Sequence, residues 1–460
     1  MKALFRNTNR RDRITGARPG WRAYQKSLQR QNTGSRWWRR KRYIPFYLAA
    51  VLVILFVFGK SDPTPPVDTG TATIPGTEIK AAAITDSEFI SKKDVRVLMG
   101  DSPLMNLDDP VVRIDFQEQA LLVTTSVDIR LQNHLIKKLD QKNSRYIGIV
   151  GMVPSTGRIL CMVGFDKGNP AGNPCLDNSF PAASIFKIVT AAAAVETRDL
   201  RELTTMNFNG YKHTLYKNQL KTSTNKYTNK ISFRDAFAQS VNPVFGKIGS
   251  LHLGKSNLEK YSNAFGFNTD LNFELDLPPS RISINDDKYE WAEIASGFNR
   301  QTTISAVHGV MVASGIVNDG KMMEPTIIDN IVSPDDQIIY RSQPQTFNTA
   351  MNTATSKILY NLMERTVTNG TAKKAFRRYK RDKTLSALNI GGKTGSIFNK
   401  KRDLRIDWFV GFAERKKGPG EMAVAVVVAH EEFIGRRAAE YAQIAISHYF
   451  ENSAGPAEKK

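Results

Sequence analysis

Ser184-Ile-Phe-Lys187 opens an apolar, alanine-rich segment in the middle of this 460-residue chain. Ile188, Val189 and the run Ala191–Ala194 follow it, which predicts a helix buried in the core. Residues i and i+3 of a helix share one face, so we expect the Lys187 amine to reach the Ser184 hydroxyl. The helix N-terminus also offers backbone N–H groups to a developing oxyanion. The segment therefore predicts a serine nucleophile with a lysine base.

Two further strings supply partners for such a pair. Ser240-Val-Asn242 is followed by Pro243, and Asn242 as N-cap with Pro243 at the first helical position is a sound helix start. Asn242 therefore has two candidate roles, as a helix cap and as a site residue. Lys393-Thr394-Gly395 is the only string of its kind in the chain. It lies in a predicted strand after Gly391-Gly392, where a ligand backbone could approach closely.

A lysine that acts as a base must first lose its proton, although its unperturbed pKa is about 10.4. Desolvation and a second cation nearby both lower that pKa. Lys393 is the natural second cation if its strand packs beside the Ser184 helix. We therefore expect Lys393 to assist Lys187.

Context separates these strings from chance matches. Ser223-Thr-Asn-Lys226 repeats the Ser-x-x-Lys spacing, but the polar run 217–230 predicts a loop, and Ser-x-Asn recurs at Ser223–Asn225 and Ser283–Asn285. Gly249–Ser256 fits a phosphate-binding loop in letters, but a predicted helix precedes it where a strand is required, which argues against nucleotide binding. The six histidines show no metal-ligand spacing, so neither a metal nor a cofactor is expected.

The N-terminal part predicts a basic tail and a membrane anchor. Residues 1–42 hold 14 Lys/Arg and the single acid Asp12, and therefore most of the net charge of +21. The uncharged run 43–59 would span about 25 Å as a helix, the short end for a membrane crossing. A helix of a globular protein would have a polar face, and this run has none. No small-x-small signal cleavage site follows it either. The flanking charge predicts a single-pass anchor with a cytoplasmic N-terminus.

The remaining boundaries follow from composition. The tail has no folded motif for nucleic acid, so we expect no nucleic-acid partner and a solvated arm attracted to anionic lipid, with docking to a cytoplasmic protein as the alternative. Residues 60–79 are a Pro/Thr/Gly linker. Residues 80–125 form a small region that contains a predicted hairpin, Val111–Phe116 with Ala120–Thr124. Residues 454–460 are a short C-terminal tail.

Residues 126–453 predict one α+β domain. Tyr146–Met152 and Arg158–Gly164 are β-runs joined by a turn. Strands from both ends of the segment, with helices between them, predict one antiparallel sheet. The other elements expected here are the strands Leu388–Ser396, Asp407–Ala413 and Glu421–Ala429 and the helices Val127–Leu139 and Arg436–Phe450.

Cys161 and Cys175 are the two cysteines of the chain. The residues between them are rich in turn formers, so a disulfide could close this loop in an oxidising compartment. Two buried free thiols are the alternative, and the sequence leaves both open.

The order and spacing of these strings resemble those of the motifs in the transpeptidase domain of penicillin-binding proteins, over residues 125 to 452. Thr125-Ser-Val-Asp-Ile-Arg-Leu-Gln132 looks like the opening of that domain, and Ala236–Phe245 resembles its second motif. Ser296-Gly-Phe echoes a later landmark, and Asp407-Trp-Phe-Val-Gly-Phe-Ala413 matches the strand after Lys-Thr-Gly. The resemblance implies a five-stranded antiparallel sheet flanked by helices, plus an all-α subregion.

The resemblance also implies a role for each site residue. Ser184 would be the acylated nucleophile, Lys187 its base, and Ser240 a proton shuttle to the leaving group. Lys393 and Thr394 would bind the terminal carboxylate, and the N–H groups of Ser184 and Ser396 would form the oxyanion hole. The substrate-binding residues implied are Asn242, Lys393, Thr394, Gly395 and Ser396.

The implied activity is a peptidoglycan D,D-transpeptidase that crosslinks stem peptides ending in D-Ala-D-Ala and is trapped by β-lactams on the same serine. With no glycosyltransferase domain before the transpeptidase, we expect a monofunctional enzyme, anchored in the inner membrane with a periplasmic catalytic domain and cell-wall-synthesis proteins as partners. A D,D-carboxypeptidase and a catalytically idle scaffold of such a complex are the alternatives. A β-lactamase or β-lactam sensor would need a deacylation device or a signalling domain, and the sequence indicates neither.

Overall fold

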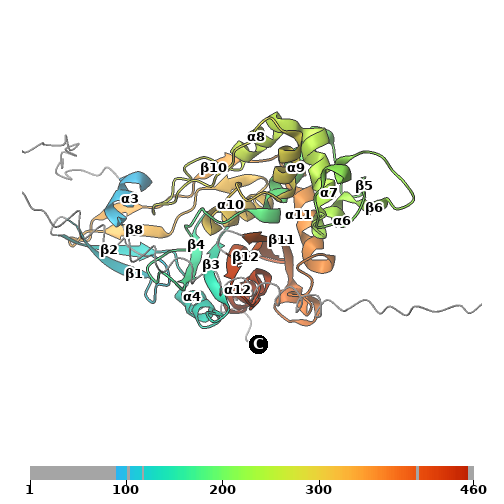
Figure 1. Cartoon of the computed structure of the whole chain (residues 1–460). Coiled ribbons are helices and arrows are strands. Elements are labelled where there is room, and N and C mark those ends of the chain that lie inside the picture. Colours follow the sequence, from blue (N-terminus) through green and yellow to red (C-terminus); the bar gives the residue numbers. More distant parts are fainter. Residues whose placement is uncertain (1–89, 101–103, 117–118, 400–402, 454–460) are drawn as a thin grey trace, which may run out of the picture. The chain divides into compact units, whose positions relative to one another are not determined.

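The computed structural model describes residues 90–100, 104–116, 119–399 and 403–453 (Figure 1). The basic tail, the predicted anchor 43–59, the linker 60–79 and the tail 454–460 lie outside these residues. Among the helices that are described, none combines the length and apolar character that a bilayer crossing requires.

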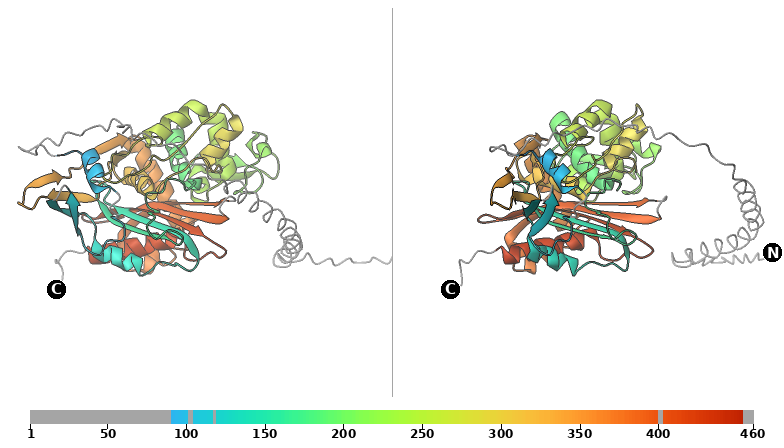
Figure 2. Two further views of the ribbon diagram at one scale, coloured as in Figure 1. Left: turned by 60° about the vertical axis from the view of Figure 1, so that its left-hand side comes forward. Right: turned by 90° about the vertical axis from the view of Figure 1, so that its left-hand side faces the viewer.

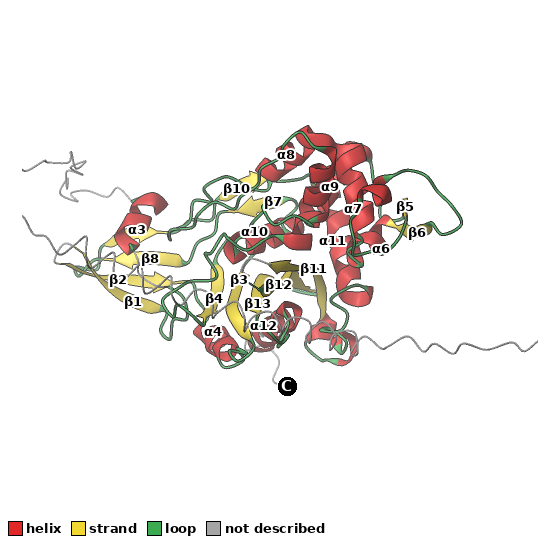
Figure 3. Ribbon diagram, in the orientation of Figure 1, coloured by secondary structure: helices red, strands yellow, loops and turns green. Residues whose placement is uncertain are grey.

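One antiparallel sheet of five strands, in the order β11-β12-β13-β3-β4, forms the centre of the fold (Figure 3). The first two strands of this sheet, β3 and β4, form a hairpin, and β3 pairs directly with the last strand, β13. This confirms the α+β class and the sheet expected from strands at both ends of the segment. The strands are β3 (Ser144–Met152), β4 (Ile159–Asp166), β11 (Leu388–Asn399), β12 (Leu404–Arg415) and β13 (Glu421–His430).

Helices cover both faces of this sheet (Figure 2). Helix α10 (Ala306–Val317) packs on β13, β12 and β3 from one side, whereas α12 (Ala438–Asn452) and α4 (Ile129–Ile136) cover the other side. A strand covered on both faces is apolar along its whole length. Residues 422–430 of β13 are accordingly all buried.

A mostly helical subregion stands on the α10 side of the sheet. It also holds a two-stranded hairpin, β5 (Thr205–Phe208) with β6 (Asn229–Ser232). A π-helical turn, Ile248–Leu253, leads into α8, so the string Gly249–Ser256 is helical and forms no phosphate loop. The helices are α5 (Lys187–Arg198), α6 (Phe233–Ala238), α7 (Asn242–Lys247), α8 (Gly254–Ala264) and α9 (Lys288–Ser296), with α11 (Thr353–Asn369) between this subregion and β11.

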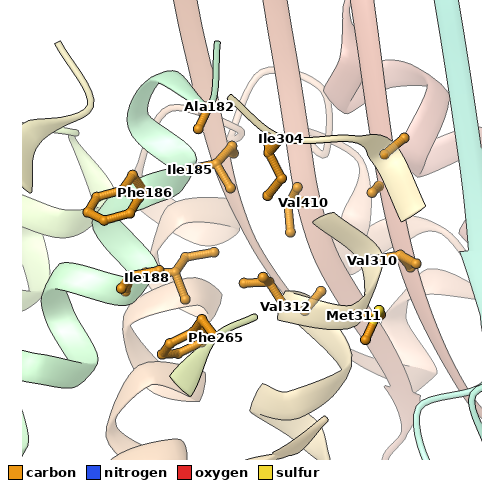
Figure 4. Packing of buried hydrophobic residues seen from close by; sticks show 14 of the residues in the cluster. Ala182, Ile185, Phe186, Ile188, Phe265, Ile304, Val310, Met311, Val312 and Val410 are labelled. Carbon is orange, nitrogen blue, oxygen red and sulfur yellow. The ribbon is translucent and has the colours of Figure 1, made fainter. Parts of the chain in front are cut away.

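The start of α5 is fixed in the largest apolar core cluster. Ile185 and Ile188 point from this segment towards Val312 of α10 and Val410 of β12 (Figure 4). All four side chains are at most 2% exposed. The residues around Ser184 are therefore held between a helix and the central sheet.

The N-terminal hairpin is confirmed as β1 (Val111–Phe116) and β2 (Gln119–Thr125). It does not stand alone, because β2 pairs with β8 (Ile328–Val332), and β8 pairs with β9 (Ile338–Arg341). The result is a second sheet of order β1-β2-β8-β9. Two smaller elements accompany it, namely α3 (Lys92–Met99) and the pair β7 (Lys321–Met323) with β10 (Thr346–Thr349).

Cys161 and Cys175 are free thiols. Cys161 packs with Leu131 in the core cluster on one side of the sheet, whereas Cys175 packs with Met162 in the cluster on the other side. The sheet thus separates the two sulfur atoms, and the disulfide that the spacing left open does not form. Burial raises the pKa of the Cys161 thiol to about 12.

Candidate active site

Ser184 lies in a 3-10 turn, Ala183–Phe186, that runs straight into α5. The sequence predicted that the helix itself begins at Ser184, and the structure places its first residue at Lys187. Ala183 has a φ of +49°, in the left-handed region, which turns the chain sharply just before the serine. Gly297, at the C-cap of α9, approaches this turn so closely that a Cβ there would lie 1.8 Å from the Ala183 carbonyl oxygen.

Lys187 is fully buried, and its amine reaches three oxygen atoms. Its Nζ lies 2.9 Å from Ser184 Oγ and 2.8 Å from Asn242 Oδ1. It also contacts the backbone carbonyl oxygen of Ser296, at the end of α9. The expected pairing of Ser184 with Lys187 is therefore present.

These contacts suit both forms of the amine: as an ammonium group it donates to all three oxygens, and as a neutral amine it can accept the proton of Ser184 Oγ. Both carbonyl oxygens can only accept hydrogen bonds, so they occupy two N–H donors of the Lys187 amine. A neutral amine has one lone pair left, and Ser184 Oγ is the only one of the three partners that carries a proton to donate. Burial, and after it the positive charge of Lys393, hold the pKa of Lys187 well below its ordinary value.

Lys393 is the second buried amine of the site. Its Nζ donates to Ser240 Oγ over 3.1 Å and to the Thr394 carbonyl oxygen over 2.8 Å. Burial lowers its pKa to about 7. Each amine also faces an aromatic ring at 5.5 Å, Phe237 for Lys393 and Phe245 for Lys187, and these two rings neighbour each other.

Asn242 does not cap α7, and its side chain contacts Lys187 instead. Val241 is the N-cap of α7, and Asn242 is its first helical residue, so the predicted cap is displaced by one position. The Asn242 amide accepts from Lys187 and donates to the His213 carbonyl oxygen over 3.1 Å. Ser240 precedes it with a φ of +56°, which turns its hydroxyl towards Lys393.

The glycines before the Lys-Thr-Gly string do not admit a ligand, contrary to the sequence interpretation. A Cβ at Gly391 would meet the ring of Phe412, and one at Gly392 would meet the ring of Phe409. Both rings belong to the neighbouring strand β12. Gly395 is the glycine that faces the site, since a Cβ there would lie 3.3 Å from the backbone nitrogen of Ser184.

A cleft of about 940 Å³ opens in front of these groups. Lys187 and Lys393 lie behind its wall, fully buried. The other six predicted residues all line it, namely Ser184, Ser240, Asn242, Thr394, Gly395 and Ser396.

Sequence reasoning missed several residues of this cleft. Thr371 hydrogen-bonds to Thr394 through the two hydroxyl groups, and Arg405 donates to Ser396 Oγ over 3.2 Å. His213, Arg300 and Arg437 also line the cleft. None of them belongs to a recognisable string. Arg405 alone had a usable signal, since it precedes the predicted strand that pairs with Lys-Thr-Gly.

The competing strings lie elsewhere. Ser223 and Lys226 are exposed in a loop between the 3-10 turn Lys217–Leu220 and β6, as expected. Neither they nor Ser283–Asn285 line the cleft.

A sequence model of the penicillin binding protein transpeptidase domain matches residues 147–447. The peptidoglycan D,D-transpeptidase PbpA of Mycolicibacterium smegmatis is 24% identical over 328 residues, which are 61% of each chain. The chain thus spans less than two thirds of the length of this relative.

Solved structures share the fold. The D,D-transpeptidase domain of a peptidoglycan glycosyltransferase from Eggerthella lenta is similar with a TM-score of 0.59, at 22% identity over 72% of this chain and 82% of that one. The imipenem acyl-enzyme complex of penicillin-binding protein A from M. tuberculosis gives a TM-score of 0.55, at 21% identity over 70% and 78% of the two chains.

Proposed function

Because the chain belongs to the family of the penicillin binding protein transpeptidase domain, we propose that it is a peptidoglycan D,D-transpeptidase that forms an acyl-enzyme on Ser184. One observation carries the proposal: the Nζ of buried Lys187 lies 2.9 Å from Ser184 Oγ and is held there by two further hydrogen bonds, to the Asn242 amide oxygen and the Ser296 carbonyl oxygen. Nucleophile and base are thus in contact before any substrate binds.

The proposed acylation begins when Lys187 takes the proton of Ser184 and Oγ attacks the carbonyl carbon of the penultimate D-Ala. The backbone N–H groups of Ser184 and Ser396 would hold the oxyanion. The amide bond then breaks, and Ser240 passes a proton to the amine of the departing D-Ala. Lys393 supports this step through its hydrogen bond to Ser240.

Deacylation reverses these roles. The amine of a second stem peptide attacks the acyl carbonyl, a new amide bond forms, and Ser184 Oγ leaves and recovers a proton.

Thr394 and Lys393 are proposed to bind the carboxylate of the donor, and Asn242 its peptide backbone. A β-lactam would follow the first half of this path only, and the imipenem acyl-enzyme of the M. tuberculosis relative supports this.

Mass spectrometry after penicillin treatment tests the nucleophile. The adduct is expected on the peptide that contains Ser184 and should be absent from Ser184→Ala. Ser223→Ala is the matched control, because Ser223 belongs to the second Ser-x-x-Lys string, and it should be acylated like wild type. An adduct on Ser223, or none on the folded wild-type protein, would refute the assignment.

A product assay separates crosslinking from its alternative. Given a donor peptide ending in D-Ala-D-Ala and an acceptor amine, the enzyme should release D-Ala and form the crosslinked dimer. Release of D-Ala with only the shortened monomer would assign a D,D-carboxypeptidase.

We also propose a membrane topology for the whole chain, with 1–42 in the cytoplasm, 43–59 as the anchor, 60–79 as a linker and the catalytic part outside. Basic residues on one side of an uncharged run support it. A periplasm-specific reporter fused after Lys460 should be active. Activity of a cytoplasm-specific reporter alone would contradict both the topology and the wall substrate.

A further inference from the structure

A second groove, of about 580 Å³, continues from the catalytic cleft. The two hollows share part of their walls, namely Lys374, Ala375, Gly435 and Glu440. Beyond this shared wall the groove is lined by Asp140, Arg377, Arg436, Gln443 and Ile444. A substrate longer than a peptide end could therefore leave the cleft along this path.

Part of the groove wall, Lys374, Ala375 and Arg377, belongs to a strongly basic segment, residues 373–383. Seven of its side chains are cationic and exposed: Lys373, Lys374, Arg377, Arg378, Lys380, Arg381 and Lys383. Within the described part of the chain, none of them forms an ion pair with a carboxylate. The single acid of the segment, Asp382, accepts hydrogen bonds from the backbone N–H groups of Thr384 and Leu385.

The acidic side chains of the groove accept hydrogen bonds from other groups of the protein. Asp140 accepts from the Asn143 amide and from the backbone N–H of Arg436, each over 3.1 Å. Glu440 accepts from the backbone N–H of Arg437 over 2.9 Å. These hydrogen bonds hold the two carboxylates in place, and three cations, Lys374, Arg377 and Arg436, line the groove beside them without a direct ion pair among the described residues.

The basic segment is fixed in place relative to the cleft. Phe376 is buried with its ring 5.8 Å from that of Phe409 in β12. The Tyr379 hydroxyl donates to the carbonyl oxygen of Leu388, the first residue of β11. Thr371, just before the segment, contacts Thr394 of the site. A ligand in the groove would thus be held at a defined distance from Ser184.

We propose that this groove extends the catalytic cleft and binds carboxylates of the peptidoglycan strand that lie outside its D-Ala-D-Ala end, an inference that rests on the proposed function. Guanidinium groups suit carboxylates because they offer two parallel N–H donors. Stem peptides repeat along the polymer, so several of their carboxylates contact several cations at once, and weak single contacts add up.

Binding to purified peptidoglycan sacculi, freed of other wall polymers, tests the groove in the full chain. The groove variant replaces Lys373, Arg377, Arg378 and Arg381 by glutamine. The control variant replaces four exposed lysines that line neither hollow, Lys93, Lys260, Lys288 and Lys321. Co-sedimentation of the groove variant at low salt should weaken at least about tenfold, and that of the control at most about twofold.

Penicillin acylation is the second readout. All three proteins should acylate Ser184 at the same rate, because the substituted residues do not line the cleft. If the groove variant binds sacculi as tightly as wild type does, the inference is overturned. It is also overturned if the acylation rate of the groove variant falls as much as its sacculus binding. Failure of wild-type acylation would refute the proposed function instead, while the binding comparison would still report on the groove.

Modified sacculi test the ligand chemistry. When the stem-peptide carboxylates are converted to amides, wild-type binding should fall to the level of the groove variant. Undiminished binding to the amidated material would overturn the assignment to carboxylates. Competition by a soluble phosphodiester polymer but not by carboxylate-bearing peptidoglycan fragments would likewise overturn it.

Discussion

At the scale of single residues, burial determines the chemistry of the two site lysines. Lys187 and Lys393 are both 0% exposed, and their hydrogen-bond partners are hydroxyl, amide and carbonyl oxygens. Among the described residues no carboxylate pairs with either amine. A buried amine without a counter-ion favours its neutral form. The sequence predicted that desolvation and a second cation together lower the pKa of Lys187, and burial is the larger of these two causes.

Lys187→Ala should lower the rate of penicillin acylation at least about 10²-fold, because among the described residues it removes the one base hydrogen-bonded to Ser184 Oγ. Stopped-flow measurement with a chromogenic β-lactam would give the rate, and a thermal melt would confirm folding. A folded variant with a near-normal rate would assign the base elsewhere.

The acylation rate at alkaline pH should depend on the charge of Lys393. Its pKa of about 7 means that it loses its charge as the pH rises above neutrality. The acylation rate constant of wild type with an anionic β-lactam should therefore decline above pH 7, because the attraction to the carboxylate is lost.

Two variants check this origin. Lys393→Arg stays charged, so it should retain part of the activity without the alkaline decline. Lys393→Met should be slow at neutral pH and recover in part at alkaline pH, where Lys187 deprotonates without help. Equal rates for both variants across the pH range would leave Lys393 a structural residue.

At the scale of elements, much of the arrangement could be predicted. Strand-like runs identified all five strands of the central sheet. Strands covered on both faces, such as β13, are apolar throughout, whereas the edge strand β11 also holds the polar pair Lys393-Thr394. The purpose of Gly391 and Gly392 could not be predicted, since it depends on which residues of β12 lie opposite them. The same holds for Asn242, whose role depends on an amine 55 positions away in sequence.

The contact between α9 and the turn Ala183–Phe186 gives a prediction at this scale. Gly297→Ala should destabilise the protein by at least about 2 kcal/mol and abolish acylation, because its Cβ would collide with the Ala183 carbonyl. Gly254→Ala is the matched control, since that residue also has a positive φ but has open space around its Cβ. It should lose about 1 kcal/mol and keep its acylation rate. Urea denaturation measures both variants, and equal losses would contradict the role of close packing.

At the scale of the whole molecule, the second sheet joins residues far apart in sequence, which no local pattern announces. Glu274 lies at this junction, fully buried, and accepts from the Tyr340 hydroxyl over 2.9 Å and from the Ile327 N–H over 3.2 Å. Ion pairs lie nearby, Lys92 with Glu324 and Arg96 with Asp270. The sequence predicted the hairpin but not the partner strand at 328–332.

The junction should make stability depend on pH. Burial raises the pKa of Glu274 above its ordinary value of 4.5, so the folded state holds this proton more tightly than the unfolded state. That contribution to stability is complete below pH 4.5 and is lost as the pH rises through the folded pKa. Relative to wild type, Glu274→Gln should therefore gain stability between pH 4 and pH 7, by about 1.4 kcal/mol per unit of pKa difference. Guanidinium denaturation at both pH values would measure the change, and a constant difference would exclude Glu274 as its source.

The two separated thiols also make this chain a convenient object for spectroscopy. Cys161 and Cys175 are fully buried, and burial raises the pKa of both, so neither presents a reactive thiolate to a labelling reagent. A cysteine introduced at exposed Tyr227 or Phe433 would then be the only site that takes a fluorophore or a spin label. With a label at each of these two positions, the distance between them could be followed in solution without first removing the native cysteines.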